Sequence, residues 1–377
     1  MRILVTGAAG FIGSHVVDLL VGHAHEVIAL DNLDPQVHGP EAREPRHLQD
    51  HVRAGAVRFL RGDVTDRGAL APALEGTDAV VHLAAAVGVG QSMYEPHYYV
   101  HTNATGSGLL LDLIAHRPDR VRKLVVASSM SLYGEGAFAC PSCGSTGAGE
   151  RSRDRLEAGR WEVPCARCGA DMEPRPTPET KTPEIASVYA ATKKHQEDLF
   201  VSFGRAWRIP TFALRFFNVY GPRQSLRNPY TGVAAIFLSR LLNAHPPLVF
   251  EDGGQSRDFI DVRDIARAVL LATEHEGEGA HVLNIGTGGK TTVNHVAQAL
   301  ATGLGLDLAP QLLDKYRAGD IRHCFSDPAR ARDVLGFVAQ YSLEDGLPAL
   351  IEWCRGESAQ DDVERSLKEL TDRRLVR

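Results

Sequence analysis

Short apolar runs alternate with longer amphipathic segments through the first half of the chain. The runs are rich in Val, Ile and Leu and lie at Ile3–Thr6, Val27–Leu30, Val57–Leu60, Ala79–Leu83 and Leu124–Ala127. Helix-length segments separate them, which is typical of parallel strands covered by helices on both faces. The pattern therefore predicts an α/β fold built on a doubly wound parallel sheet.

Helical periodicity is clearest at Phe11–Val21, Tyr98–His116 and Val188–Trp207, and further strands are expected at Thr211–Phe216 and Val282–Ile285. The second of these strands is expected to return to the same sheet. After Pro222 the pattern becomes irregular, with helices expected at 233–242, 265–273, 293–304 and 343–353.

These changes of pattern divide the chain into parts. We expect a nucleotide-binding domain from residues 1–134 and 183–222, an insertion at 135–182 and a smaller α/β substrate-binding domain mainly from 223–354. The highly charged residues 355–377 are expected to form a solvated helical tail.

Composition narrows the class of protein. The chain has 377 residues, of which 44% are hydrophobic, and this length is enough for two to three globular units. The formal net charge is -6, which gives no reason to expect a nucleic-acid partner. No stretch approaches the ~20 apolar residues of a membrane span, and no signal peptide is visible. We therefore expect a cytoplasmic protein without a membrane partner.

A glycine motif marks the first turn of the sheet. Gly7-Ala8-Ala9-Gly10-Phe11-Ile12-Gly13 follows the first strand and opens the first helix, so backbone N–H groups can approach a pyrophosphate. Asp31 ends the second strand, where a carboxylate can accept hydrogen bonds from ribose hydroxyls and would repel a 2′-phosphate. Together they predict a Rossmann domain that binds NAD rather than NADP.

The end of the third strand offers a site for the adenine. Gly62-Asp63-Val64 follows that strand, and the Asp63 side chain could approach the amino group of the base. A simple strand-end turn is the alternative. Asn32, directly after Asp31, is expected among the cofactor contacts.

Tyr189 and Lys193 carry the candidate chemistry. They are four residues apart in a helical pattern and share one face, so the lysine could stabilise a phenolate that removes a proton from a sugar hydroxyl. Ser129 ends the fifth strand and could hydrogen-bond to the same hydroxyl. A surface tyrosine beside a solvated lysine, and an ordinary strand-end serine, are the alternatives.

An ordered set of motifs carries a family resemblance. It consists of the glycine motif, His82-Leu83-Ala84-Ala85, Asn103, Ser128-Ser129 with Tyr133-Gly134, the Tyr189/Lys193 pair and Arg215-Phe216-Phe217-Asn218-Val219-Tyr220-Gly221-Pro222. Over about residues 1–134 and 183–350 the chain resembles the extended short-chain dehydrogenase/reductase family of sugar-nucleotide epimerases and dehydratases.

The resemblance implies roles residue by residue. Ser129, Tyr189 and Lys193 match the catalytic set, and a homodimer through the helices of Asn103 and Tyr189 is implied. The implied NAD contacts are Gly7, Gly10, Phe11, Ile12, Gly13, Asp31, Asn32, Asp63, Val64, Leu83, Ala84, Ala85, Asn103, Tyr189, Lys193 and Phe216. The implied substrate contacts are Ser129, Ser131, Asn218, Arg257 and Arg322, the two arginines facing a diphosphate. Surface salt bridges are the alternative for the arginines.

Members of this family begin by oxidising the sugar, usually at C4. The dehydratase subgroup then needs an Asp-Glu pair where this chain has Met130 and Ser131, and the decarboxylase subgroup has Glu at the second position. We therefore expect a sugar-nucleotide 4-epimerase that forms a transient 4-keto sugar and keeps its NAD tightly bound. The alternatives are a dehydratase or decarboxylase, with Glu135 as a replacement carboxylate, and a non-catalytic NAD-sensing binding protein.

Four of the six cysteines form two Cys-x-x-Cys pairs in the insertion, Cys140 with Cys143 and Cys165 with Cys168. Gly144 and Gly169 follow the pairs and permit tight turns. Four thiolates suit tetrahedral zinc and leave no open position, so we expect a structural zinc site. Redox pairs and free cysteines are the alternatives. Our hypothesis is that the insertion forms a lid or wall over the sugar, or a subunit contact.

Overall fold

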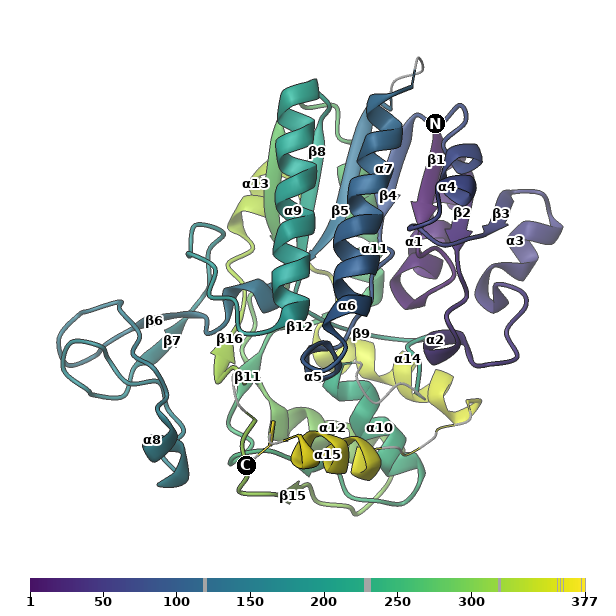
Figure 1. Ribbon diagram of the computed structural model, residues 1–377. Coiled ribbons are helices and arrows are strands. Elements are labelled where there is room, and N and C mark those ends of the chain that lie inside the picture. Colours follow the sequence, from purple (N-terminus) through teal and green to yellow (C-terminus); the bar gives the residue numbers. More distant parts are fainter. Residues whose placement is uncertain are drawn as a thin grey trace.

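The computed structural model describes residues 1–117, 121–226, 232–317, 320–357, 359, 361, 363–373, 375 and 376. A layered domain forms the larger part of the molecule, a smaller helical part lies below it, and the insertion projects to one side (Figure 1).

The larger domain is built on one parallel sheet of seven strands in the order β13-β8-β5-β4-β1-β2-β3. The strands are β1 (Arg2–Thr6), β2 (Glu26–Asp31), β3 (Val57–Arg61), β4 (Ala79–His82), β5 (Lys123–Ser129), β8 (Thr211–Phe216) and β13 (Ala280–Ile285). Every predicted strand is present, and the return of the seventh strand to this sheet is confirmed.

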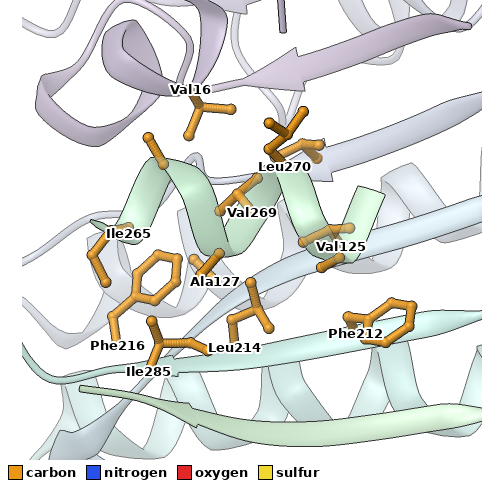
Figure 2. Packing of buried hydrophobic residues seen from close by; sticks show 14 of the residues in the cluster. Val16, Val125, Ala127, Phe212, Leu214, Phe216, Ile265, Val269, Leu270 and Ile285 are labelled. Atoms are coloured by element: carbon orange, nitrogen blue, oxygen red, sulfur yellow. The ribbon is translucent and has the colours of Figure 1, made fainter. Parts of the chain in front are cut away.

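Helices cover both faces of the sheet, as predicted. One face packs against α1 (Phe11–Gly22), α11 (Val262–Glu274) and α13 (Ala329–Leu335), and Figure 2 shows Val16 of α1 and Val269 of α11 above Val125 of the sheet. The other face packs against α4 (Arg67–Ala73), α7 (Gly106–Ala115) and α9 (Val188–Trp207). The sequence assigned α11 to the substrate-binding part, but its apolar face lies on the sheet.

The predicted helix at 98–116 is a composite. It begins as α6 (Pro96–Tyr99), continues as a π-helical segment η2 (Val100–Thr105) and ends as α7. Shorter elements near the strand ends are α2 (Pro35–His38), η1 (Arg46–Leu48), α3 (Gln49–Arg53), α5 (Val89–Ser92) and η3 (Met130–Tyr133).

The smaller part has its own apolar core between α10 (Val233–Leu242), α12 (Val293–Leu304) and α14 (Leu343–Arg355). Its short strands are β9 (Asn218–Tyr220), β10 (Leu248–Val249), β11 (Ser256–Arg257), β12 (Phe259–Asp261), β14 (Thr291–Thr292), β15 (Gln311–Leu312) and β16 (His323–Cys324). The insertion contains β6 (Ala137–Ala139), α8 (Arg153–Glu157) and β7 (Glu173–Arg175), with β6 and β7 antiparallel.

The C-terminal tail is helical at α15 (Val363–Asp372), but it is not simply solvated. Leu370 is buried against Gly90 of α5, and the Arg373 guanidinium lies 4.4 Å from the centre of the Tyr94 ring. The prediction for the tail missed this packing, and residues 358, 360, 362, 374 and 377 of it lie outside the described residues. In the described part of the chain, no helix combines the length and apolar character that a bilayer crossing requires.

Candidate active site

A cavity of about 390 Å³ opens at the carboxyl ends of the sheet strands. Glycines of the first turn lie at one end, Asp31 and Asp63 beside them, and Ser129, Tyr189 and Lys193 farther along. Of the predicted NAD contacts, all line this cavity except Asn103. Crevices at this edge of a parallel sheet are where ligands of such folds bind.

The glycine turn is shaped for close backbone approach. Gly7 has a φ of +68°, and a Cβ on it would lie 2.8 Å from the Ala84 amide nitrogen. A Cβ on Gly13 would lie 2.0 Å from the carbonyl oxygen of Gly7. Helix α1 begins after Gly10 without a side-chain cap, so its first amides face the cavity and suit a pyrophosphate.

Asp31 stands beside this turn at the end of β2. Its two carboxylate oxygens accept hydrogen bonds from the amides of Ala9 and Leu33, each at 2.9 Å. The side chain is buried yet lines the cavity, so it is fixed while a lone pair on each oxygen stays available. The geometry fits ribose hydroxyls and opposes a phosphate at the same position.

Asp63 closes the adenosine end. It accepts hydrogen bonds from Thr65 and, at 2.8 Å, from the side-chain amide of Asn32. Burial alone would raise the pKa of Asp63, but these hydrogen bonds outweigh it and hold the pKa below its usual value. Asn32 and Asp63, both expected among the cofactor contacts, therefore lie together on the cavity wall.

The three candidate catalytic residues meet at the other end. Ser129 ends β5, and its hydroxyl accepts a hydrogen bond from the Ser131 hydroxyl at 2.9 Å. Tyr189 and Lys193 come from the first turns of α9, which Ser187 caps by accepting a hydrogen bond from the Ala190 amide. All three line the cavity, whereas Ser131 lies behind Ser129 and is not among its lining residues.

Burial shapes the titration of this pair. It raises the pKa of the Tyr189 phenol, and the hydrogen bond with Ser129 partly opposes that change. Burial lowers the pKa of Lys193 to about 7, against the attraction of Glu197, and its ammonium donates to the Gln196 side chain. Burial therefore disfavours the charged form of both groups.

Asn103 has a different place from the one predicted. It is fully buried, accepts a hydrogen bond from the Ala86 amide at 2.7 Å and donates to the Ala86 carbonyl and the Thr192 hydroxyl. It therefore ties the cavity-lining loop after β4 to helix α9 and positions the cofactor site instead of lining it. His82 is also structural, bonded to Thr6 and Ser107 inside the core.

The predicted substrate contacts are only partly brought together. Asn218 lines the cavity, and its buried side-chain oxygen has no hydrogen-bond partner among the described residues. Arg257 and Arg322 do not line it. The Arg322 guanidinium is buried between Glu162, Glu251 and Asp252, whose carboxylates lie 2.6 to 3.0 Å away. Because these anions already balance its charge, Arg322 packs the insertion against the substrate-binding part.

Acidic groups are unevenly distributed around the cavity. Among the described lining residues they are Asp31, Asp34 and Asp63, all at the adenosine end. Glu135, the predicted substitute carboxylate, is neither there nor solvated, because it accepts hydrogen bonds from the amides of Arg322 and His323. No carboxylate of the described lining residues therefore stands beside Ser129.

The sequence missed several lining residues, among them Gln36, Gln91, Tyr98, Gln224 and Phe259. Phe259 lies on the short strand β12, and Gln36, Gln91 and Tyr98 lie in short helices, so their place at the cavity depends on tertiary packing.

The four cysteines of the insertion converge, as predicted. Their sulfur atoms all lie within 4.8 Å of one another, with 3.5 Å between Cys140 and Cys168 and 3.6 Å between Cys143 and Cys165. Zn–S bonds of about 2.3 Å require sulfur separations of about 3.8 Å, so the arrangement fits tetrahedral zinc. Gly144 and Gly169 take the left-handed turns that were expected.

The insertion does not wall the cavity. None of its described residues is among those lining it, and Figure 1 shows the insertion projecting away from the sheet domain. The hypothesis of a lid or wall over the sugar is therefore wrong, because the ion pairs of Arg322 and Arg151 dock the insertion on the substrate-binding part.

Known proteins share this architecture. Residues 3–151 and 166–286 match the NAD dependent epimerase/dehydratase family. A dTDP-L-rhamnose 4-epimerase from Burkholderia thailandensis is 36% identical over 94% of this chain and 95% of its own length. A UDP-glucose 4-epimerase from Mycolicibacterium smegmatis is 31% identical over 95% of this chain and all of its own length.

Solved structures agree. The UDP-glucose 4-epimerase of Thermotoga maritima, solved with UDP-glucose, has a TM-score of 0.76 and 32% identity, covering 94% of this chain and 99% of that one. The UDP-glucuronic acid 4-epimerase of Bacillus cereus, solved with UDP-glucuronic acid and NAD, has the same TM-score and coverage at 27% identity. With the glycine turn, Asp31 and the Ser129/Tyr189/Lys193 set in register, the chain belongs to the NAD dependent epimerase/dehydratase family of enzymes.

Proposed function

We propose that this enzyme inverts the 4-hydroxyl of a nucleoside-diphosphate hexose through a transient 4-keto sugar. The observation that carries the proposal is that Ser129, Tyr189 and Lys193 line one end of the cavity that also contains the glycine turn and Asp31. The relatives named above are 4-epimerases, and the B. thailandensis protein makes dTDP-L-rhamnose the first sugar nucleotide to test.

The residues divide the work of the oxidation. Tyr189 takes the proton of the sugar 4-hydroxyl, Ser129 hydrogen-bonds to that oxygen, and the Lys193 ammonium stabilises the phenolate. When bound, NAD would supply the hydride acceptor for C4 and a positive charge that further favours the phenolate. The 4-keto sugar then turns, Tyr189 returns the proton, and hydride comes back to the opposite face, so no net oxidation remains.

Asn218 supports a diphosphate-linked substrate on the far side of the cavity. Its orphaned side-chain oxygen is a buried acceptor that a ligand donor can satisfy, while its NH₂ group can donate to a phosphate oxygen. For the dehydratase and decarboxylase alternatives an acid or base near the sugar is required, and Met130 and Ser131 occupy the relevant positions.

Product analysis separates these reactions. Purified protein would be incubated with dTDP-L-rhamnose, UDP-glucose and UDP-glucuronic acid without added NAD, and the products identified by NMR. We expect a 4-epimer from at least one of them. A 4-keto-6-deoxy sugar or carbon dioxide would instead identify the dehydratase or the decarboxylase, and no product with bound NAD would favour a sensor.

We also propose that Cys140, Cys143, Cys165 and Cys168 hold one structural zinc ion. The sulfur separations support it, because they match those of a tetrahedral site with four thiolate ligands. Elemental analysis should give one zinc per chain, falling to zero in Cys143→Ser, while Arg167→Ala in the same loop keeps it. An absence of metal in the native protein would contradict the site.

Assembly and location complete the proposal. We propose a homodimer through the helices that contain Asn103 and Tyr189, as the family resemblance implies, and exposed Val89, Met93 and Val100 near those helices support it. Light scattering should give a mass of two chains, and a monomer would refute the pairing.

A cytoplasmic location is supported by six unbridged cysteines, which suit a reducing compartment.

A further inference from the structure

The cysteine insertion is spliced into the chain between the catalytic residues. Its first strand, β6, begins eight residues after Ser129, and its returning arm runs from β7 to Ser187, which caps the helix that carries Tyr189. Since the insertion does not line the cavity, these two connections are its most direct covalent route to Ser129 and Tyr189.

The returning arm is pinned at Thr177, which is completely buried. Its hydroxyl accepts a hydrogen bond from the Ala137 amide of β6, and its own amide donates to the Phe325 carbonyl at 2.8 Å. Its carbonyl accepts a hydrogen bond from the Asn284 side chain at 2.9 Å. The arm thus joins the base of the insertion to the last strand of the parallel sheet.

Glu179 carries the connection toward the active site. Its carboxylate accepts a hydrogen bond from the Asn284 amide at 2.7 Å, and its carbonyl accepts one from the Arg215 guanidinium. Arg215 also donates to the Tyr133 hydroxyl at 2.7 Å, and Tyr133 in turn donates to the Asn284 side chain. Four segments distant in sequence share this buried group of hydrogen bonds.

The network reaches residues close in sequence to the catalytic set. Arg215 donates two hydrogen bonds to Glu197, at 2.8 and 2.9 Å, and Glu197 lies one turn after Lys193 on α9. The same carboxylate accepts the Ser128 hydroxyl at 2.7 Å, next to Ser129. Glu197, Arg215 and Ser128 are each at least nine-tenths buried, so the network is shielded from bulk solvent and its hydrogen bonds hold these side chains in one geometry.

We infer that the insertion is a positioning element whose metal holds Thr177 and Glu179 in the network that sets Ser129 relative to Tyr189 and Lys193. Few apolar residues pack inside the insertion, so we expect the metal to supply most of the stability of the antiparallel β6–β7 pair. This inference rests on the proposed 4-epimerase and zinc site. According to this inference, the insertion affects the rate of the chemical step and leaves the affinity for the substrate unchanged.

The test compares native enzyme, enzyme stripped of metal by a chelator, and two variants of Glu179. Removing zinc should lower kcat by about tenfold or more, because small displacements of reacting groups are costly. KM should change by less than about twofold and NAD should stay bound. Restoring zinc should restore kcat. Glu179→Ala should behave like the stripped enzyme, while Glu179→Gln, which keeps the acceptor for the Asn284 amide, should stay near the native rate.

A raised KM with unchanged kcat, or no change in either, would overturn the inference, as would equal rates for the two Glu179 variants. Hydrogen exchange keeps it testable if no epimerase activity is found. Removing zinc should then expose amides of residues 128–133 as well as the insertion. Exposure confined to residues 137–175 would refute the positioning role without bearing on the reaction.

Discussion

Replacing Lys193 with Met should stabilise the NAD-free protein while abolishing its activity. The lysine is buried, and burial lowers its pKa from 10.5 to about 7. At pH 7 the unfolded chain binds a full proton at this position and the folded chain only about half of one. The folded state therefore carries a penalty of about 4 kcal/mol.

Methionine fills a similar volume without a charge to bury. The substitution also removes the hydrogen bond from the ammonium to the Gln196 side chain, which costs about 1 kcal/mol. The free energy of unfolding at pH 7 should therefore rise by about 3 kcal/mol. The gain should shrink as the pH rises toward 10. Between the folded and unfolded pKa values of Lys193, the unfolded native protein binds more protons than the folded one, so the stability of the native protein rises with pH while that of the variant does not change for this reason.

Urea denaturation of NAD-free protein at pH 7, 8.5 and 10 measures this difference. Lys194→Met is the matched control, since the adjacent lysine is partly exposed and pairs with Asp198 on the surface. The control should show no comparable gain. The reasoning fails if the Lys193 variant is less stable than the native protein at pH 7, or if the difference between them does not depend on pH.

Three further substitutions test the cofactor site. Gly13→Ala should abolish NAD binding in a fluorescence titration, because the new Cβ would clash with the Gly7 carbonyl oxygen. Gly22→Ala in the same helix has open space around it and should bind NAD normally. Equal NAD affinities of the two variants would contradict the close backbone approach at Gly13. Asp31→Ala should weaken NAD binding by about tenfold or more, and an unaltered dissociation constant would remove the ribose contact. Asn103→Ala should lower the free energy of unfolding by about 1–3 kcal/mol, and an unchanged urea midpoint would show that the loop after β4 is not held by this amide.

The sheet and the catalytic set were predictable because local patterns encode them. Continuous apolar runs specify strands buried on both faces, and the glycine turn, Asp31 and the Tyr189/Lys193 spacing depend on short stretches of chain. The family that the ordered motifs indicate is confirmed by the match to the NAD dependent epimerase/dehydratase family. The similar proteins named above are 4-epimerases. The four cysteines could also be placed together, because two Cys-x-x-Cys pairs with this spacing are typical of a four-thiolate metal site.

The rest depended on long-range partners that no local pattern contains. Arg322 was expected at a phosphate, but Glu162 lies 160 residues earlier in the chain and reaches it only through the folded insertion. Asn103 was expected at NAD, yet its partners are the Ala86 backbone and Thr192 on another helix. The packing of Leu370 against Gly90 is also a long-range contact. The tail is highly charged, so its sequence gives no local sign that Leu370 is buried.

The central claim is that the Tyr189 phenol moves the proton of the sugar 4-hydroxyl beside bound NAD. The direct test is the rate of 4-epimer formation by native enzyme and Tyr189→Phe, followed by NMR without added NAD, with NAD content measured in both. The account predicts that the variant keeps its NAD and turns over about a thousandfold more slowly. Turnover of the variant at the native rate would contradict it.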